Sequence, residues 1–340
     1  MSVFDPILAS LKRFDTEALL DLRPKYPPVA IEIDRGRLTL VRVRANRRAL
    51  PALEAFRVHP TAEHAAGATM FKPNVGPLDE LARQLRELFA ASGTKPGRVS
   101  LILPDNLAKV SIVTLPEKPA TRGLLREMLR FKLRRSLPFR LEDAVISSHA
   151  LPGLGPEQHY LVAAMLRSVV EQYETALAAV GARPGLVDLC TPSLFNLVRP
   201  VLQKATAAGG DAALLNCTRG YFTLMIVRSD RVVFFRCKSY AAGEDDAVAG
   251  RLAVLSRELA SSLSYYTDKL GGAGVGTLFV RAVSPSLDEV VPVLERVGAT
   301  TVRAIDATES LAPLPGPGLD PVDGQTLAPA LGAASGRSAA

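Results

Sequence analysis

The chain has 340 residues, of which 48% are hydrophobic and 22% charged, a composition typical of a globular protein with a packed core. This length favours two domains or one two-lobed domain. Lys and Arg outnumber Asp and Glu by 41 to 34, and this modest excess fits an anionic partner surface of lipid, nucleic acid or acidic protein. No run approaches the roughly 20 apolar residues of a membrane-spanning helix, so we expect a soluble protein of the cytoplasm. The odd number of cysteines, all in or beside apolar runs, predicts reduced core thiols at Cys190, Cys217 and Cys237.

The first half of the fold is expected over residues 28–116, after a lead-in helix at 1–27. A segment of β-branched residues at 29–44 carries a tight turn at Arg35-Gly36, which is the signature of a hairpin. The patterns that follow predict a helix and two strands, at 78–91, 98–103 and 109–115.

An inserted αββαβ subdomain is predicted over residues 117–188, and a helix at 189–210 closes the first half. The subdomain begins with a helix at 121–137, in which six Arg or Lys residues stand against Glu127 alone. The helix ends there because Pro138 cannot continue it. Two interpretations of the charged face stay open. It is either a solvated surface whose arginine stems cover apolar residues, or a docking face for an acidic partner.

The second half is expected over residues 211–312 and opens with a similar meander, which turns at Arg219-Gly220. Sliding one meander onto the other aligns this turn with Arg35-Gly36 and aligns Thr39 with Thr223. Such repetition predicts a duplicated α/β domain with a cleft between its halves, and a chance match of a short β pattern is the alternative. Residues 313–340 are expected to form a Pro/Gly linker, a short helix and a tail.

Catalytic motifs are sparse in this sequence. The four histidines lack metal-ligand spacing, and there is neither a Gly-x-Ser-x-Gly elbow nor a Walker loop. A glycine-rich run at 271–276 follows a helix and precedes a strand, which is the wrong order for directing a helix N-terminus at phosphate. The two glycine turns are better candidates, because facing hairpin turns could hold the phosphates of a nucleotide. Glu32, Asp34 and Asn216 would be needed to hold a metal ion.

The order of these elements resembles the actin-like fold shared by sugar kinases, heat-shock ATPases and the cell-division protein FtsA. Three segments are similar to PilM, the family of cytoplasmic type IV pilus assembly proteins. They are EMLRFKLRRSLPFRLED from Glu127, RELASSLSYY from Arg257 and LAPALG from Leu327. The resemblance implies an α/β, actin-like, duplicated ribonuclease-H-type fold with an inserted αββαβ subdomain.

The chain departs from this family at the nucleotide site. Both phosphate turns of the family carry Asp-x-Gly, whereas this chain has the segments 32–36 and 216–218 there. A carboxylate in place of glycine repels phosphate, and any side chain blocks close backbone approach. We therefore expect no enzyme, no metal site, and a cleft that binds ATP and magnesium weakly or not at all, although the arginines of the turns could compensate in part. The candidate cofactor-binding residues are Glu32, Asp34, Arg35, Gly36, Asn216, Thr218, Arg219 and Gly220.

The resemblance also implies a scaffold on the cytoplasmic face of the inner membrane, serving a type IV pilus or a related secretion machine. It would bind the cytoplasmic tail of a PilN-like single-span protein and other platform or motor components, and would meet the membrane only indirectly. The tail is expected in a groove between the first half and the inserted subdomain. The candidate partner-binding residues are Phe131, Leu137, Pro138, Phe139, Arg130 and Arg134. The alternative is an active ATPase or small-molecule kinase of the same superfamily. Nucleic-acid binding is not expected, because aromatic residues make up only 6% and tryptophan is absent.

Overall fold

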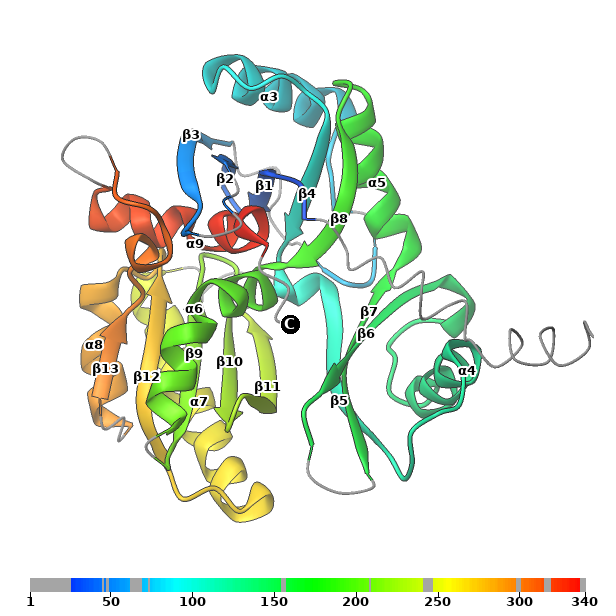
Figure 1. Cartoon of the computed structure of the whole chain (residues 1–340), viewed down its shortest axis with the longest axis vertical. Coiled ribbons are helices and arrows are strands. Elements are labelled where there is room, and N and C mark those ends of the chain that lie inside the picture. Colours follow the sequence, from blue (N-terminus) through cyan, green and yellow to red (C-terminus); the bar gives the residue numbers. More distant parts are fainter. Residues whose placement is uncertain are drawn as a thin grey trace, which may run out of the picture.

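The computed structural model describes residues 26–44, 46, 49–61, 69–72, 74–153, 157–207, 209–240, 247–297, 301–314 and 319–336. Apart from its last two residues, the lead-in helix predicted at 1–27 lies outside these ranges. Two five-stranded sheets and one three-stranded sheet form the framework of the described residues (Figure 1). No helix within these ranges is long and apolar enough to cross a bilayer.

The first half is built on a sheet with the strand order β3-β2-β1-β4-β8. The central strand β1 runs antiparallel to β2 and parallel to β4. The five strands are β1 (Val29–Asp34), β2 (Arg37–Arg44), β3 (Ala52–Pro60), β4 (Arg98–Leu103) and β8 (Arg183–Leu189). Helices α3 (Leu78–Ala91) and α5 (Arg167–Ala178) bury their apolar faces against one side of this sheet.

The second half repeats this topology, with the strand order β11-β10-β9-β12-β13. Its strands are β9 (Asp211–Cys217), β10 (Tyr221–Arg228), β11 (Arg231–Ser239), β12 (Val275–Ala282) and β13 (Thr301–Ala304), and α7 (Val248–Leu270) and α8 (Leu287–Arg296) pack on its outer face. The register also repeats, because Thr39 lies opposite Glu32 and Thr223 lies opposite Asn216. The duplication predicted from the two meanders is therefore confirmed.

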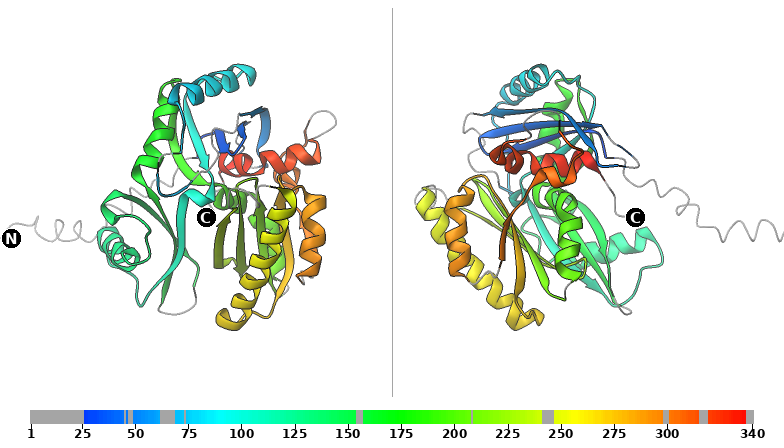
Figure 2. Two further views of the ribbon diagram at one scale, coloured as in Figure 1. Left: turned by 180° about the vertical axis from the view of Figure 1, so that it is seen from behind. Right: turned by 60° about the vertical axis from the view of Figure 1, so that its left-hand side comes forward.

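Two helices lie between the sheets and join the halves. They are α6 (Cys190–Ala207) and α9 (Pro321–Ser335), and one buried cluster includes side chains from both helices and from both sheets. Figure 2 shows α9 against β1 and β2. The two helices can approach closely because residue 332 is a glycine. A Cβ at this position would lie only 1.9 Å from the backbone oxygen of Ser193, which is too close for two atoms that are not bonded. The sequence predicted this helix within a C-terminal tail, whereas the structure makes it part of the core.

The inserted unit is smaller than predicted and begins earlier. It consists of β5 (Ala108–Leu115), α4 (Arg122–Leu133), β6 (Ala144–Leu151) and β7 (Gln158–Leu166), with the strand order β5-β7-β6. The predicted boundary at 117–188 excluded β5 and wrongly included α5 and β8. These two elements belong to the first half, because α5 packs on its sheet and β8 pairs in parallel with β4. The order of elements did not reveal which sheet each would join.

Candidate functional site

The two glycine turns predicted at the nucleotide site face each other across the halves. A Cβ placed on Gly36 would lie 3.7 Å from Nη1 of Arg219, and one on Gly220 would lie 3.8 Å from Cδ of Arg35. Each turn therefore places its arginine near the glycine of the other turn. Gly36 has a φ of 80°, which an L side chain rarely adopts, so the turn between β1 and β2 depends on glycine.

The turn between β9 and β10 is closed by its own side chain. The hydroxyl of Thr218 accepts hydrogen bonds from the backbone N–H groups of Gly220 and Tyr221, both at 3.3 Å. These are donors of the kind that a glycine-rich turn would offer to a phosphate. A ligand at this turn must therefore compete with an internal bond.

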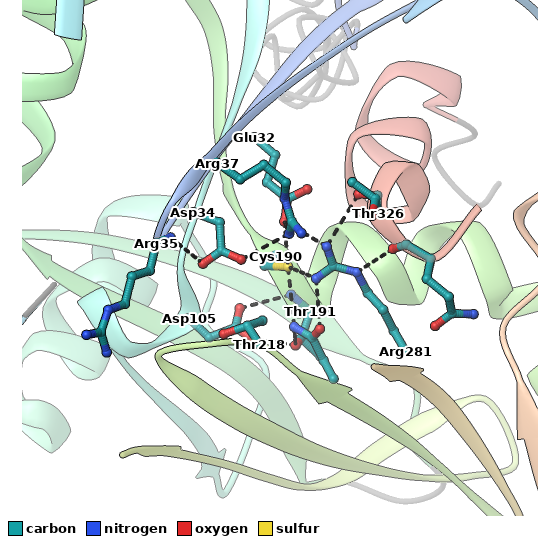
Figure 3. A network of polar contacts seen from close by, with 12 residues as sticks. Glu32, Asp34, Arg35, Arg37, Asp105, Cys190, Thr191, Thr218, Arg281 and Thr326 are labelled. Atoms are coloured by element: carbon teal, nitrogen blue, oxygen red, sulfur yellow. Dashed lines mark hydrogen bonds and ion pairs between the residues drawn. The ribbon is translucent and has the colours of Figure 1, made fainter. Parts of the chain in front are cut away.

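A buried arginine on β12 joins both halves at this point (Figure 3). Arg281 is completely buried, and its Nη2 lies 3.1 Å from Oε1 of Glu32 on β1. Its Nη1 donates to Oδ1 of Asn216 on β9 at 2.9 Å, and its Nε donates to the backbone oxygen of Gln325 on α9 at 2.7 Å. Burial has the largest single effect and would lower the pKa of the guanidinium, but Glu32 and the neighbouring Cys190, Asp34 and Tyr221 together outweigh it and raise the pKa, so Arg281 stays a cation.

The predicted metal ligands are thus already bonded within the protein. Glu32 and Asn216 bind Arg281, while Asp34 accepts from the backbone N–H of Arg35 at 2.8 Å and from Nη2 of Arg37 at 3.1 Å. Magnesium favours several oxygen ligands in an octahedron that keeps some of its waters. A site holding a guanidinium between its carboxylate and its amide does not fit that ion. Within the described ranges, no group of three His, Cys, Asp or Glu residues could hold a metal.

A second buried acid lies beside this network. Asp105 follows β4 and accepts hydrogen bonds from the backbone N–H of Thr191 at 2.9 Å, from the hydroxyl of Thr191, and from the hydroxyl of Thr223 at 2.7 Å. Burial raises its pKa to about 6, and these hydrogen bonds oppose the shift. The amide of Asn216 donates to the hydroxyl of Thr191 at 3.0 Å, so the cluster continues to the Arg281 network.

Sequence reasoning missed Asp105, Thr191 and Arg281. Arg281 carried the clearest signal, because it is a charged residue within the apolar run of β12, TLFVRAV. A charge in a buried strand requires a partner, although the sequence does not say which one. Asp105 and Thr191 lie at the ends of predicted elements and gave no distinct pattern.

A cationic pocket of about 360 Å³ opens beside the turns. Arg35, Arg37, Arg219 and Arg251 line it, together with the carboxylate of Asp34. Arg251 is only 5% exposed. The chemistry of this pocket suits an anion that needs no metal, which extends the sequence-based expectation that the arginines of the turns compensate for the missing acidic pairs.

An apolar groove of about 280 Å³ separates the inserted unit from the first half. One wall comes from the inserted sheet and the other from α5, β8 and the start of α6. The lining residues are Val110, Val145, Ser147, Ser148, His149, Leu161, Ala163, Met165, Val170, Glu174, Val187, Asp188, Leu189 and Pro192. The groove lies against one face of the inserted sheet, because Val110 of β5 and Leu161 of β7 both line it, and two of its contributing strands, β6 and β8, are edge strands of their sheets.

The predicted partner-binding residues do not line this groove. Leu137 packs with α4 against one face of the inserted sheet, whereas the groove lies at the other face. Phe131 is 77% exposed on the outside of α4. Arg134, Pro138 and Phe139 follow the end of that helix, and Arg134 is exposed. The apolar groove is therefore not formed by these residues. Whether α4 contacts a partner stays a prediction.

The sequence matches no model of a known protein family and no curated protein. Its structure is similar to a chain of the PilM-PilN type IV pilus biogenesis complex, with a TM-score of 0.77 and 21% identity over 92% of this chain and 98% of the other. The similarity predicted from three segments is thus confirmed at the level of the fold, which is actin-like and duplicated.

Two further structures are similar at a lower level. One is a protein of unknown function with an actin-like ATPase fold from Bacteroides thetaiotaomicron, with a TM-score of 0.48, 8% identity, and coverage of 85% of this chain and 96% of the other. The other is the cytoplasmic domain of EpsL, an inner-membrane component of the type II secretion system of Vibrio cholerae. Its TM-score is 0.48, with 11% identity and coverage of 88% of this chain and 93% of the other. Similarity at this level does not establish a relationship.

Replacing Arg281 with Met is expected to lower the free energy of unfolding by about 3–5 kcal/mol, because Glu32 is left buried without its cation. Adding Glu32→Gln is expected to recover most of this loss. Urea unfolding measures both effects. The control Arg44→Met removes an exposed ion pair with Glu54 and is expected to cost no more than about 1 kcal/mol. Equal losses for Arg281→Met and the control would contradict this assignment.

Asp105→Asn is expected to remove a pH-dependent component of stability. The native pKa of Asp105 is about 6 and the unfolded value is about 3.8, so the native state binds the proton more tightly. The native protein therefore loses stability as pH rises from about 4 to about 6, by roughly 3 kcal/mol in total. Urea unfolding across this range should show a smaller decrease for the variant. An identical pH dependence in the two proteins would mean that Asp105 does not titrate in this range.

Proposed function

We propose that this chain is a non-enzymatic scaffold of a type IV pilus or related secretion machine, and that its apolar groove holds the cytoplasmic tail of a PilN-like single-span membrane protein. The groove between the inserted sheet and the first half is the observation that carries this proposal. The similarity in fold to PilM, determined as a complex with PilN, supports it. On this proposal the protein works in the cytoplasm at the inner membrane, and other platform or motor components are further partners.

The lining of the groove indicates how a tail would bind. The walls are mainly aliphatic, with Leu161 and Ala163 on one side and Val187 on the other. Apolar side chains of an extended peptide would be buried there, while an edge strand, β6 or β8, offers backbone hydrogen bonds. Side-chain pockets then give specificity, and main-chain bonds contribute to affinity.

The Arg281 network at the predicted phosphate site supports the non-enzymatic part of the proposal. Arg281 holds a positive charge between Glu32 and Asn216, the positions at which Asp-x-Gly turns of the family begin. Phosphoryl transfer in this superfamily depends on a metal that neutralises developing charge on the phosphates. A fixed guanidinium, fully bonded within the core, leaves no room for that exchangeable ion. The cationic pocket, which four arginines line, is the observation that favours the alternative, an ATPase or small-molecule kinase.

Calorimetry with ATP is expected to show weak binding or none, with no gain when magnesium replaces EDTA, because the acidic ligands are already paired. No hydrolysis is expected in a phosphate-release assay. Micromolar binding that requires magnesium and leads to hydrolysis would instead support the ATPase alternative.

A charge in the groove is expected to abolish binding of the partner tail. The probe is a synthetic peptide with the cytoplasmic tail of a single-span protein encoded beside this chain, and affinity is measured by calorimetry. Val145→Asp and Ala163→Asp are expected to raise the dissociation constant at least about tenfold, because they place an uncompensated charge against apolar side chains. Val145 is 38% exposed, so the first variant should fold normally.

Phe131→Asp is the matched control, because it adds the same charge on the outside of α4. We expect it to bind the tail as the native chain does. The proposal fails if the groove variants retain the peptide. Loss of binding in Phe131→Asp alone would place the tail on α4, near the partner-binding residues predicted from the sequence.

A further inference from the structure

The outer surface of α4 exposes two apolar side chains that the core does not use. Phe131 is 77% exposed and Leu124 is 43% exposed. They are seven residues apart, so they share one side of the helix. The buried residues Leu129 and Leu133 lie on the opposite side, against the inserted sheet. The helix is therefore apolar on two faces, and only one of them is covered within the described ranges.

Positive charge surrounds this exposed pair. Residues 122–140 contain seven Arg or Lys residues and a single acidic residue, Glu127. Lys132 lies in the last turn of α4, and Arg134 and Arg135 directly follow its last residue, Leu133. These three side chains are exposed and take part in no ion pair with another described residue. Their charge is thus available to an external anionic surface.

We infer that this face of α4 binds directly to an anionic lipid bilayer. The combination of protruding apolar side chains with a cationic surround is that of a helix lying in the membrane interface, where apolar residues enter the headgroup region and Lys and Arg meet anionic headgroups. α4 lies at the periphery of the molecule, on the far side of the inserted sheet from the second half (Figure 1). Phe131 and Leu124 are exposed on this face, and apolar side chains in such a position can enter the headgroup region of a flat bilayer.

The inference goes beyond the proposed scaffold function and does not depend on it, but the two are compatible. The groove and the exposed face of α4 belong to the same small unit and lie on opposite sides of one sheet. A helix packs roughly 10 Å from a neighbouring layer. A short cytoplasmic tail that leaves the membrane near α4 could therefore reach the groove, since an extended chain spans roughly 3.3 Å per residue.

A single tryptophan tests the contact directly. The native chain has none, so Phe131→Trp places one reporter on the exposed face. With vesicles that contain phosphatidylglycerol, its emission is expected to shift to the blue and to be quenched by brominated lipid. Phe71→Trp is the control, at another side chain that is 63% exposed, and it is expected to stay unchanged. Unchanged emission at position 131, or an equal shift in both variants, would overturn the inference.

Sedimentation with vesicles tests the two contributions separately. The native chain is expected to bind vesicles with phosphatidylglycerol, to bind pure phosphatidylcholine far less, and to dissociate as salt increases. Arg134→Glu with Arg135→Glu is expected to lower partitioning at least about 30-fold, and Leu124→Ser with Phe131→Ser should also lower it. The controls Arg86→Glu with Lys95→Glu, which make the same change in net charge on exposed residues elsewhere, and Phe71→Ser should bind as the native chain does.

Three results would count against the lipid assignment. Equal binding to both lipids would remove the electrostatic part, and equal losses in the variants and their controls would remove the role of α4. Binding to poly-glutamate without binding to either vesicle would assign the face to an acidic protein segment instead. Circular dichroism confirms that each variant is folded.

Discussion

The joint between the two halves depends on a buried ion pair, Arg281 with Glu32. Burying a guanidinium away from solvent costs free energy unless an opposite charge and hydrogen-bond acceptors compensate for the lost hydration. Here a carboxylate from the first half, an amide from the second half and a carbonyl from α9 satisfy it together. One side chain therefore requires three segments, distant in sequence, to keep a fixed relative position. The apolar cluster around α6 and α9 surrounds this joint and excludes water from it.

This constraint changes what the cleft can do. A metal ion held by side chains is an exchangeable cation, because it can dissociate from its ligands. In this chain the cation is part of the polypeptide, and the turns pack arginine against glycine across the cleft. The two turns and the Arg281 network thus connect the halves across the cleft. The cationic pocket beside the cleft is lined by four arginines, so its chemistry suits an anion without a metal ion.

The inserted unit carries the two surfaces for which we propose partners. Its three-stranded sheet has the apolar groove on one face and α4 on the other. An apolar groove on a sheet face and a cationic helix with an exposed Phe131 offer different recognition chemistries. Both surfaces are proposals for contact with a membrane-bound machine, one with a peptide and the other with lipid.

The sequence by itself determined the local elements, the glycine turns and the duplication, because each of these produces a pattern among residues that are close in the sequence. The alignment of Gly36 with Gly220 was visible as a repeat, and the charged character of α4 was visible as a composition. Only the tertiary structure decided which sheet β8 joins, which face of the inserted sheet α4 covers, and that α9 is buried. It also decided that Arg281 meets Glu32, 249 residues away. Such choices depend on the free energy of packing and desolvation between distant segments, and local patterns do not contain that information.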